Sequence, residues 1–209
     1  MPLITKTEAK ARSVSELSAN AATDTILDDL IARADEMIAE ACGMPRPSAI
    51  GLRTMASATY TLYSGEGWLD VDPVNARILR VGVRPVTTIT SVHEAVDEAF
   101  DSGALVASAD YGSRGELAEE IYLSQTSTHG QWSRQDRRIK AVVVAGWATA
   151  PGTLKQAAAE LVMHLYELRT RRGKTSIQQG NLNTAYRTEI IPDHILATLG
   201  EYMCAGAVA

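Results

Sequence analysis

The 209-residue chain is poor in cysteine and aromatic residues and contains no long apolar run. Its two cysteines, Cys42 and Cys204, lie far apart and form no CxxC motif, so no disulfide framework is expected and a reducing compartment fits. No stretch approaches the roughly 18 apolar residues of a membrane span, and the first residues lack the apolar core of a signal peptide. We therefore expect a protein that is made in the cytoplasm and has no membrane partner.

Signatures of common catalytic and cofactor sites are also missing from the sequence. It contains no Gly-rich phosphate loop and no Gly-x-Ser-x-Gly motif. One face of a predicted helix carries Glu160, His164 and Glu167. Side chains of these types bind metal ions, and they also serve as acid and base in small hydrolases. Pairing of Glu167 with Arg171, one helical turn later, explains the same cluster without a metal. We therefore predict no catalytic residue, no metal, no cofactor and no enzymatic activity.

The charge of the chain does not indicate a nucleic-acid-binding protein. A net charge of −5 argues against a dedicated nucleic-acid binder. The basic residues form two clusters, Arg134, Arg137, Arg138 and Lys140 in the first and Arg169, Arg171, Arg172 and Lys174 in the second. The first cluster suits either a phosphate or a solvated strand edge. The second lies at the end of a predicted helix, where the helix dipole favours cations without any ligand.

The strongest helical pattern extends from Gly152 to Arg172. Helical spacing places two apolar strips on it, Leu154, Leu161 and Leu165 on one side and Ala159, Met163 and Tyr166 nearly opposite. A helix that is apolar over so much of its circumference is buried on two sides. One side faces the core of its own domain, and the other needs another element of this chain or another copy of it.

A second helix is predicted from Thr23 to Cys42, before Gly43 and Pro45. Its polar face is acidic and includes Asp28, Asp35 and Glu36. Such a face is either simply solvated or forms an anionic wall past which a negatively charged cargo slides.

The middle of the chain is rich in β-branched residues and in turn signals. Candidate strands are 54–63, 68–71, 78–83, 86–92, 104–111, 121–123 and 139–147, of which the last has the strongest pattern. At the amino end, 1–12 has no clear pattern and 13–19 suggests a short helix. After the main helix, 173–187 is polar and typical of a loop that is mobile or binds something. Residues 188–203 predict a helix with Pro192 in its first turn.

These patterns predict an α+β fold. We expect a mainly helical bundle core with a β-rich insertion between the N-terminal and main helices, plus a C-terminal arm. Residues 1–172 would form a single domain, helical at 13–43 and 152–172, with the insertion at about 54–148. Residues 173–209 would form a flexible loop and a C-terminal helix.

Three sequence blocks carry a resemblance to a known family. The first is A-x-x-x-I-x-x-x-C-G, here Ala34, Ile38, Cys42 and Gly43. The second is VVVAGWATAPGTLKQAAAELVMHLYELR at 142–169, and the third is Ile191-Pro192 before a C-terminal helix. Together they resemble the head–tail connector (adaptor) proteins of tailed bacteriophages, which form the neck ring below the portal. Gene transfer agents use the same kind of adaptor.

The resemblance implies a structural virion protein made in the host cytoplasm and located in the neck. Such a protein forms a ring with neighbouring copies, typically twelve, on the portal protein and extends the DNA channel. It also provides the docking surface for a stopper or tail-terminator protein, while genomic DNA passes without sequence-specific binding. Two alternatives stay open, another neck or tail-completion protein of the stopper type and an adaptor of a gene transfer agent.

On this interpretation, three groups of residues have roles. The subunit interface would contain Ala159, Met163 and Tyr166. The DNA channel would be faced by Asp28, Asp35 and Glu36. The portal-docking arm would contain Ile190, Ile191, Ile195, Leu196, Leu199, Tyr202 and Met203.

Overall fold

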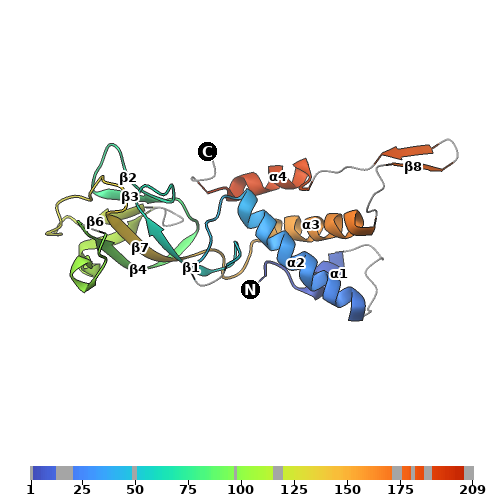
Figure 1. Ribbon diagram of the computed structural model, residues 1–209, viewed down its shortest axis with the longest axis horizontal. Helices are drawn as coiled ribbons and strands as arrows, with labels where there is room; N and C mark the ends of the chain where they lie inside the picture. The colour runs from blue at the N-terminus through green and yellow to red at the C-terminus, as the bar shows by residue number, and fades with distance from the viewer. Residues whose placement is uncertain are drawn as a thin grey trace.

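The computed structural model shows an elongated molecule with a β lobe at one end and a helical lobe at the other (Figure 1). It describes residues 2–12, 21–48, 51–96, 98–114, 120–170, 176–179, 182–185 and 190–204. The short helix predicted at 13–19 lies outside these residues.

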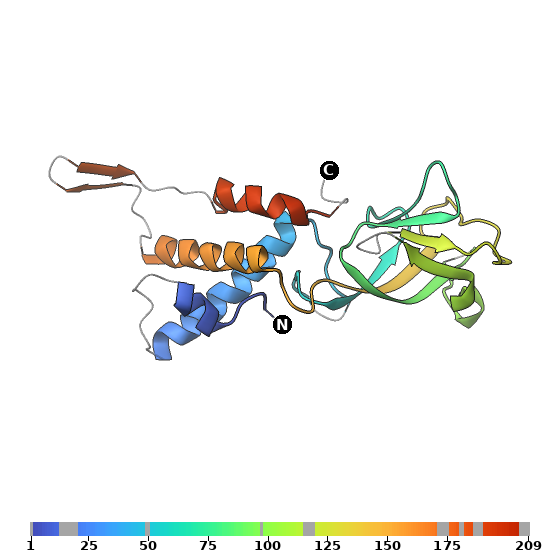
Figure 2. The same ribbon diagram turned by 180° about the vertical axis from the view of Figure 1, so that it is seen from behind.

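The helical lobe is built around α3 (Gly152–Thr170), which fills the centre of a layer of helices. On one side it is covered by α1 (Lys6–Arg12) and α2 (Ala21–Ala41), and on the other by α4 (Asp193–Leu199). A short 3-10 turn, η3 (Gly200–Tyr202), follows α4. The view from behind shows the same order (Figure 2). None of the described helices combines the length and the apolar content that crossing a bilayer requires.

The β lobe contains two antiparallel sheets. The first has the strand order β1 (Ala58–Tyr63), β7 (Ile139–Ala145), β4 (Val86–Glu94). The second has the order β2 (Leu69–Val71), β3 (Ile78–Val81), β6 (Glu120–Leu123), β5 (Tyr111–Arg114), and two short 3-10 turns, η1 (Ser102–Ala104) and η2 (Ser108–Asp110), precede β5. Every second residue of β7 is buried, as its alternating sequence predicts.

A third pair of strands lies outside both lobes. β8 (Ser176–Gln179) and β9 (Leu182–Ala185) form an antiparallel hairpin that projects beyond the carboxyl end of α3, away from the β lobe (Figures 1 and 2). We call this pair the β8–β9 hairpin. Among the described strands, β8 and β9 pair only with one another.

The two lobes share a continuous apolar core that crosses their junction. It includes Tyr60, Ile121 and Val143 from strands and Leu27, Leu154 and Ile195 from helices. At the junction, Gly146 has a φ of +100°, and a Cβ there would lie 2.4 Å from the carbonyl oxygen of Ala56. Only glycine allows this approach. The Trp147 ring then packs edge-on against Tyr202, with ring centroids 6.1 Å apart.

The prediction of a mainly helical bundle core is wrong. Two antiparallel sheets supply a large part of the core, so the segment between α2 and α3 is a lobe rather than an insertion on a helical bundle. The alternating strands of this segment bury one face each, which gives them a core of their own.

Three local predictions also need correction. Residues 6–12 form α1 where no pattern was expected, and 104–111 contains η2, with a strand beginning only at its last residue, Tyr111. The polar segment 173–187 contains the β8–β9 hairpin. In α1, the Thr5 N–H donates to Glu8 Oε2 over 2.8 Å while the Glu8 N–H donates to Thr5 Oγ1 over 3.2 Å. This is the reciprocal pattern of a capping box, a signal that the T-x-x-E sequence contained.

Candidate assembly surfaces

Both apolar strips of α3 are covered by helices of the same chain. Leu154 and Leu161 are fully buried, and Ala159 on the opposite strip is 3% exposed. The second strip faces α4, whose Ile195 and Leu199 belong to the same core cluster. The two-sided burial follows from the sequence pattern, and α4 is the cover that the pattern alone did not identify.

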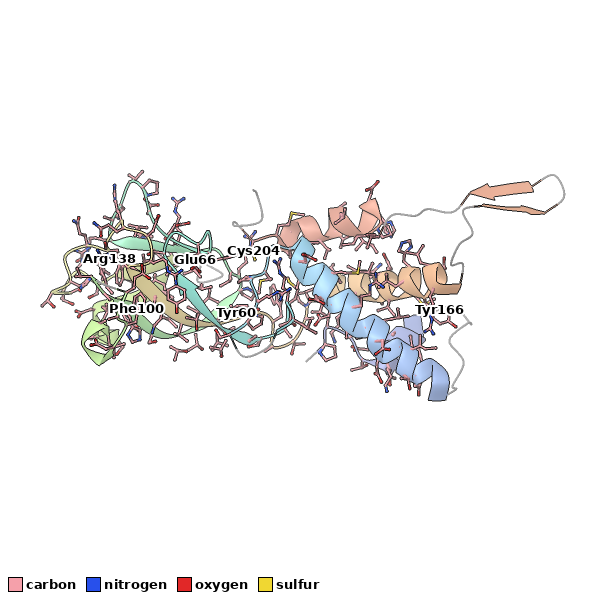
Figure 3. The ribbon with its side chains drawn as sticks, viewed as in Figure 1. Tyr60, Glu66, Phe100, Arg138, Tyr166 and Cys204 are labelled. Carbon is pink, nitrogen blue, oxygen red and sulfur yellow. The ribbon has the colours of Figure 1, made fainter. Side chains whose placement is uncertain are left out.

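The three predicted interface residues have different environments. Ala159 is buried, whereas Met163 and Tyr166 are partly buried and pack against the core. Tyr166 lies near the carboxyl end of α3, the end from which the β8–β9 hairpin projects (Figure 3). Of the predicted interface, therefore, only Met163 and Tyr166 retain accessible surface for a neighbouring molecule.

A groove of about 570 Å³ lies between α3 and α4, and we call it the α3–α4 groove. Ala159, Met163 and Ile195 supply its apolar lining, and the polar lining includes Glu160, Glu167, His164 and His194. The Glu160 carboxylate accepts a hydrogen bond from Gln156 over 2.9 Å and lies 3.5 Å from His194 Nε2. Both glutamates are exposed. The groove thus combines an apolar lining with negative charge.

The alternative of a metal site at this cluster has no geometric support among the described residues. Within the described residues, no three His, Cys, Asp or Glu side chains are grouped so that they could hold a metal ion.

The predicted docking arm lies largely against its own chain. Ile195 and Leu199 are buried, Ile191, Leu196, Tyr202 and Met203 are partly buried, and Ile190 is 62% exposed. Two contacts fix the end of this segment at the junction: the Tyr202 hydroxyl is hydrogen-bonded to Thr153, and the Cys204 N–H donates to the Cys42 carbonyl over 2.8 Å. Figure 3 shows Cys204 at this boundary between the lobes.

The acidic face of α2 is partly covered by the amino-terminal segment. Lys6 Nζ lies 3.0 Å from the Asp28 carboxylate, and Lys10 pairs with Asp24. Glu36 is partly buried, so Asp28 is the most exposed of the three predicted channel residues. Sequence periodicity placed Asp28, Asp29 and Glu40 on a face that is exposed, but it contained no sign that α1 lies beside this face.

Asp35 is in a different environment from the rest of the acidic face. Its carboxylate lines a cavity of about 440 Å³ and accepts a hydrogen bond from Thr54 Oγ1 over 3.1 Å. Its second oxygen, Oδ1, is buried and finds no hydrogen-bond partner among the described residues. Burial raises the pKa of Asp35 to about 6. This residue is consequently a half-buried acid at the contact between α2 and the chain before β1.

The first basic cluster is occupied with internal contacts in the β lobe. Arg137 lies 3.4 Å from the Glu66 carboxylate and 3.3 Å from that of Glu98, and it stacks on the Tyr63 ring. Arg134 donates to the Pro73 carbonyl over 3.0 Å. The contacts of Arg134 and Arg137 brace loops, which explains these two members of the cluster without a phosphate ligand.

Comparison with known proteins identifies similar folds. No protein-family model matches the chain, and neither does any curated protein sequence. A chain in the neck of an empty gene transfer agent particle, computed with C6 symmetry, matches 97% of this chain and 90% of its own length, with 16% identity and a TM-score of 0.57. A chain in the virion of a native gene transfer agent particle matches 95% of this chain and 87% of its own, with 16% identity and a TM-score of 0.54. At this identity, the similarity shows a shared fold across almost the whole length.

Proposed function

We propose that this chain is a structural protein of the neck of a phage-like particle, specifically the head–tail connector that forms a ring on the portal. It would extend the DNA channel and offer its free face to a stopper or tail-terminator protein. It would act without catalysis, and its place would be the neck of the virion after synthesis in the host cytoplasm.

The observation that carries this proposal is the fold similarity along nearly the full length to a chain in a particle neck. A match to one lobe alone would have been weak evidence for function, because small sheets and helix layers recur in unrelated proteins. Since the similar structures come from gene transfer agent particles, the gene-transfer-agent form of the adaptor is the favoured one.

Ring formation is compatible with the surfaces of the helical lobe. A cyclic ring with one kind of subunit needs two different patches, one on each flank. Met163 and Tyr166 lie on the flank of α3 that α4 covers only in part, and α1 and α2 form the other flank. The number of copies, twelve in the resembling family, is part of the proposal.

The acidic residues of α2 are proposed to face the channel. Attraction between a channel wall and phosphates would slow the passage of DNA, and negative charge avoids it. In this role Asp28 and Glu36 contribute more than Asp35, whose carboxylate is half-buried against Thr54. For portal docking, the exposed Ile190 is the most accessible residue of the predicted arm.

The test is co-assembly with the cognate portal protein. The two purified proteins are mixed, sedimented together and imaged by negative stain. We expect a ring of this protein on one face of the portal. A portal that sediments alone, at protein concentrations of tens of micromolar, would contradict the proposed function.

A further inference from the structure

The β8–β9 hairpin is a sheet of only two strands, so each strand has one edge without a neighbour. Its two strands pair with one another in antiparallel register and with no other described strand. Both views show the hairpin beyond the carboxyl end of α3, with neither sheet of the β lobe beside it (Figures 1 and 2). The outward backbone N–H and C=O groups of β8 and β9 therefore have no strand partner within the described part of the chain.

These two edges lack the common devices that protect a strand edge from pairing. Such devices include Lys and Pro residues and β-bulges. The sequence from 176 to 185, SIQQGNLNTA, contains no proline and no charged residue. Its register runs without a bulge through four pairs, from Ser176 with Ala185 to Gln179 with Leu182. Since an isolated two-stranded hairpin is at best marginally stable in water, further strands would stabilise it.

The register also indicates which backbone groups face outward. Gln179 pairs with Leu182, and two residues of sequence separate them. A pair that closes so short a connection exchanges its backbone hydrogen bonds, and the next pair of an antiparallel ladder does not. The next pair is Gln178 with Asn183. The backbone of Gln178 is therefore directed to the outer edge of β8, and that of Asn183 to the outer edge of β9.

The symmetry of a ring brings these two edges together in the correct direction. Every copy in a cyclic ring has the same orientation relative to the ring axis. Because β8 and β9 run in opposite directions within one copy, β9 of one copy and β8 of the next are also antiparallel. The outer edges of β8 and β9 are two different patches of one chain, which is the head-to-tail kind of contact that a ring requires.

We propose that the hairpins of neighbouring copies pair edge to edge, β9 of one copy with β8 of the next, and form one continuous antiparallel sheet around the ring. A closed sheet has no free edge. Twelve copies would give about 24 strands and, at about 4.8 Å between strands, a circumference of at least about 115 Å. Barrels of roughly 16–18 strands already enclose an aqueous channel, so this sheet leaves room for one. The inference rests on the proposed ring function and adds the segment that joins the copies.

Amide hydrogen exchange of the full chain tests the pairing directly. Exchange at 176–185 is measured in the free protein, in single copies bound to an excess of portal, and in complete rings on the portal. We expect exchange at least ten-fold slower in the complete ring than in the other two states, because only there does each edge have a neighbour. Equal exchange in all three states overturns the proposal. Slow exchange already in single copies on the portal also overturns it and makes the portal the partner of the hairpin.

A proline variant tests whether the edge contributes to ring formation. Asn183→Pro removes the outward N–H of β9 and leaves the hydrogen bonds within the hairpin in place. Asn183→Ala is the matched control, because it removes the same side chain and keeps the N–H. Ring yield on the portal is measured by negative stain and native mass spectrometry. We expect a loss of at least ten-fold for the proline variant and a normal yield for the alanine variant.

The other edge is tested in the same way by Gln178→Pro and its control Gln178→Ala. Normal ring yields in both proline variants overturn the proposed pairing. Circular dichroism checks that each variant is folded, and if a proline variant is unfolded, the exchange measurement on the unmodified chain decides. In all these outcomes, portal binding by the unmodified protein still supports the proposed function. Failure of the unmodified protein to bind portal refutes the function itself.

Discussion

The two lobes differ in how far they are closed: hydrogen bonds hold loops of the β lobe against its sheets, whereas the helical lobe borders the α3–α4 groove and carries the projecting β8–β9 hairpin. In the β lobe, Trp132 is buried and its indole N–H donates to the Arg77 carbonyl over 3.2 Å. The Arg77 guanidinium in turn donates to the carbonyls of Gly130 and Ser124 over 3.1 and 2.6 Å. These hydrogen bonds hold long loops against the sheets.

The helical lobe is more open. Its central helix is buried on both sides, yet it borders the open α3–α4 groove, and a hairpin projects beside it. Buried polar atoms do not distinguish the lobes, because Asp35 Oδ1 in the helical lobe and His93 Nδ1 in the β lobe both lack a hydrogen-bond partner among the described residues. From this difference we expect that the β lobe depends strongly on its buried loop contacts and that the proposed assembly contacts lie in the helical lobe.

The largest expected effect is the loss of the buried indole in the β lobe. Trp132→Ala removes a large core side chain and its hydrogen bond, which typically costs about 3–5 kcal/mol of the free energy of unfolding. Urea denaturation measures the loss. Val74→Ala, at a position that is 91% exposed in the same lobe, is the control and should change stability by less than about 0.5 kcal/mol. A cost below that of an ordinary surface change for Trp132→Ala would contradict a self-contained β lobe.

The second prediction asks whether α4 belongs to the core of the helical lobe. Leu199 is fully buried, so Leu199→Ala should destabilise the free protein by about 2–4 kcal/mol. Leu196→Ala, on the partly buried side of the same helix, should cost clearly less. Amide exchange in α4 should accordingly be slow before any partner is added. If Leu199→Ala leaves unfolding unchanged, α4 is a detachable arm.

The sequence alone could not predict whether α4 belongs to the core. Helical periodicity predicted helices at 23–42 and 152–172, close to the observed α2 and α3, and alternation predicted β7. These elements are long and their patterns repeat several times. α1 was missed because a helix of seven residues and a capping box are a weak signal, and the β8–β9 hairpin was missed because its strands are short and polar.

Of the candidate site, the sequence predicted only the features that lie within a single helix. Two apolar strips on α3 established burial on two sides, but nothing in a single helix tells whether α4 or a second copy provides the cover. The same limit applied to Asp35: its spacing placed it on a polar face, while Thr54, which lies far along the chain from α2, determines its surroundings. Both are properties of tertiary contacts.

The third expected effect concerns Asp35 and is a gain of stability. The pKa of its buried carboxyl is about 6 in the folded protein, above the ordinary value of 3.8, so folding favours the protonated form. This contribution is fully present below pH 3.8 and is lost as the pH rises to about 6. Asp35→Asn removes the charge, and at pH 7 it should raise the free energy of unfolding by about 1–3 kcal/mol, given roughly 1.4 kcal/mol per pKa unit. Urea denaturation at pH 4 and pH 7 measures the difference.

Glu8 in the same lobe provides the control with the opposite sign. Its carboxylate accepts a hydrogen bond from Lys155 over 2.7 Å and others from Thr5, and these contacts lower the pKa of Glu8 from 4.5 to about 2. Its contribution is therefore present above pH 4.5 and is lost as the pH falls towards 2. Because the Glu8 side chain is 36% exposed, Glu8→Gln should cost only about 0.5–1 kcal/mol at pH 7 and little at pH 2. Asp35→Asn should instead stabilise at pH 7 and approach the unmodified protein at pH 4. If both variants shift in the same direction with pH, a general effect of net charge is responsible, and the burial of Asp35 is not.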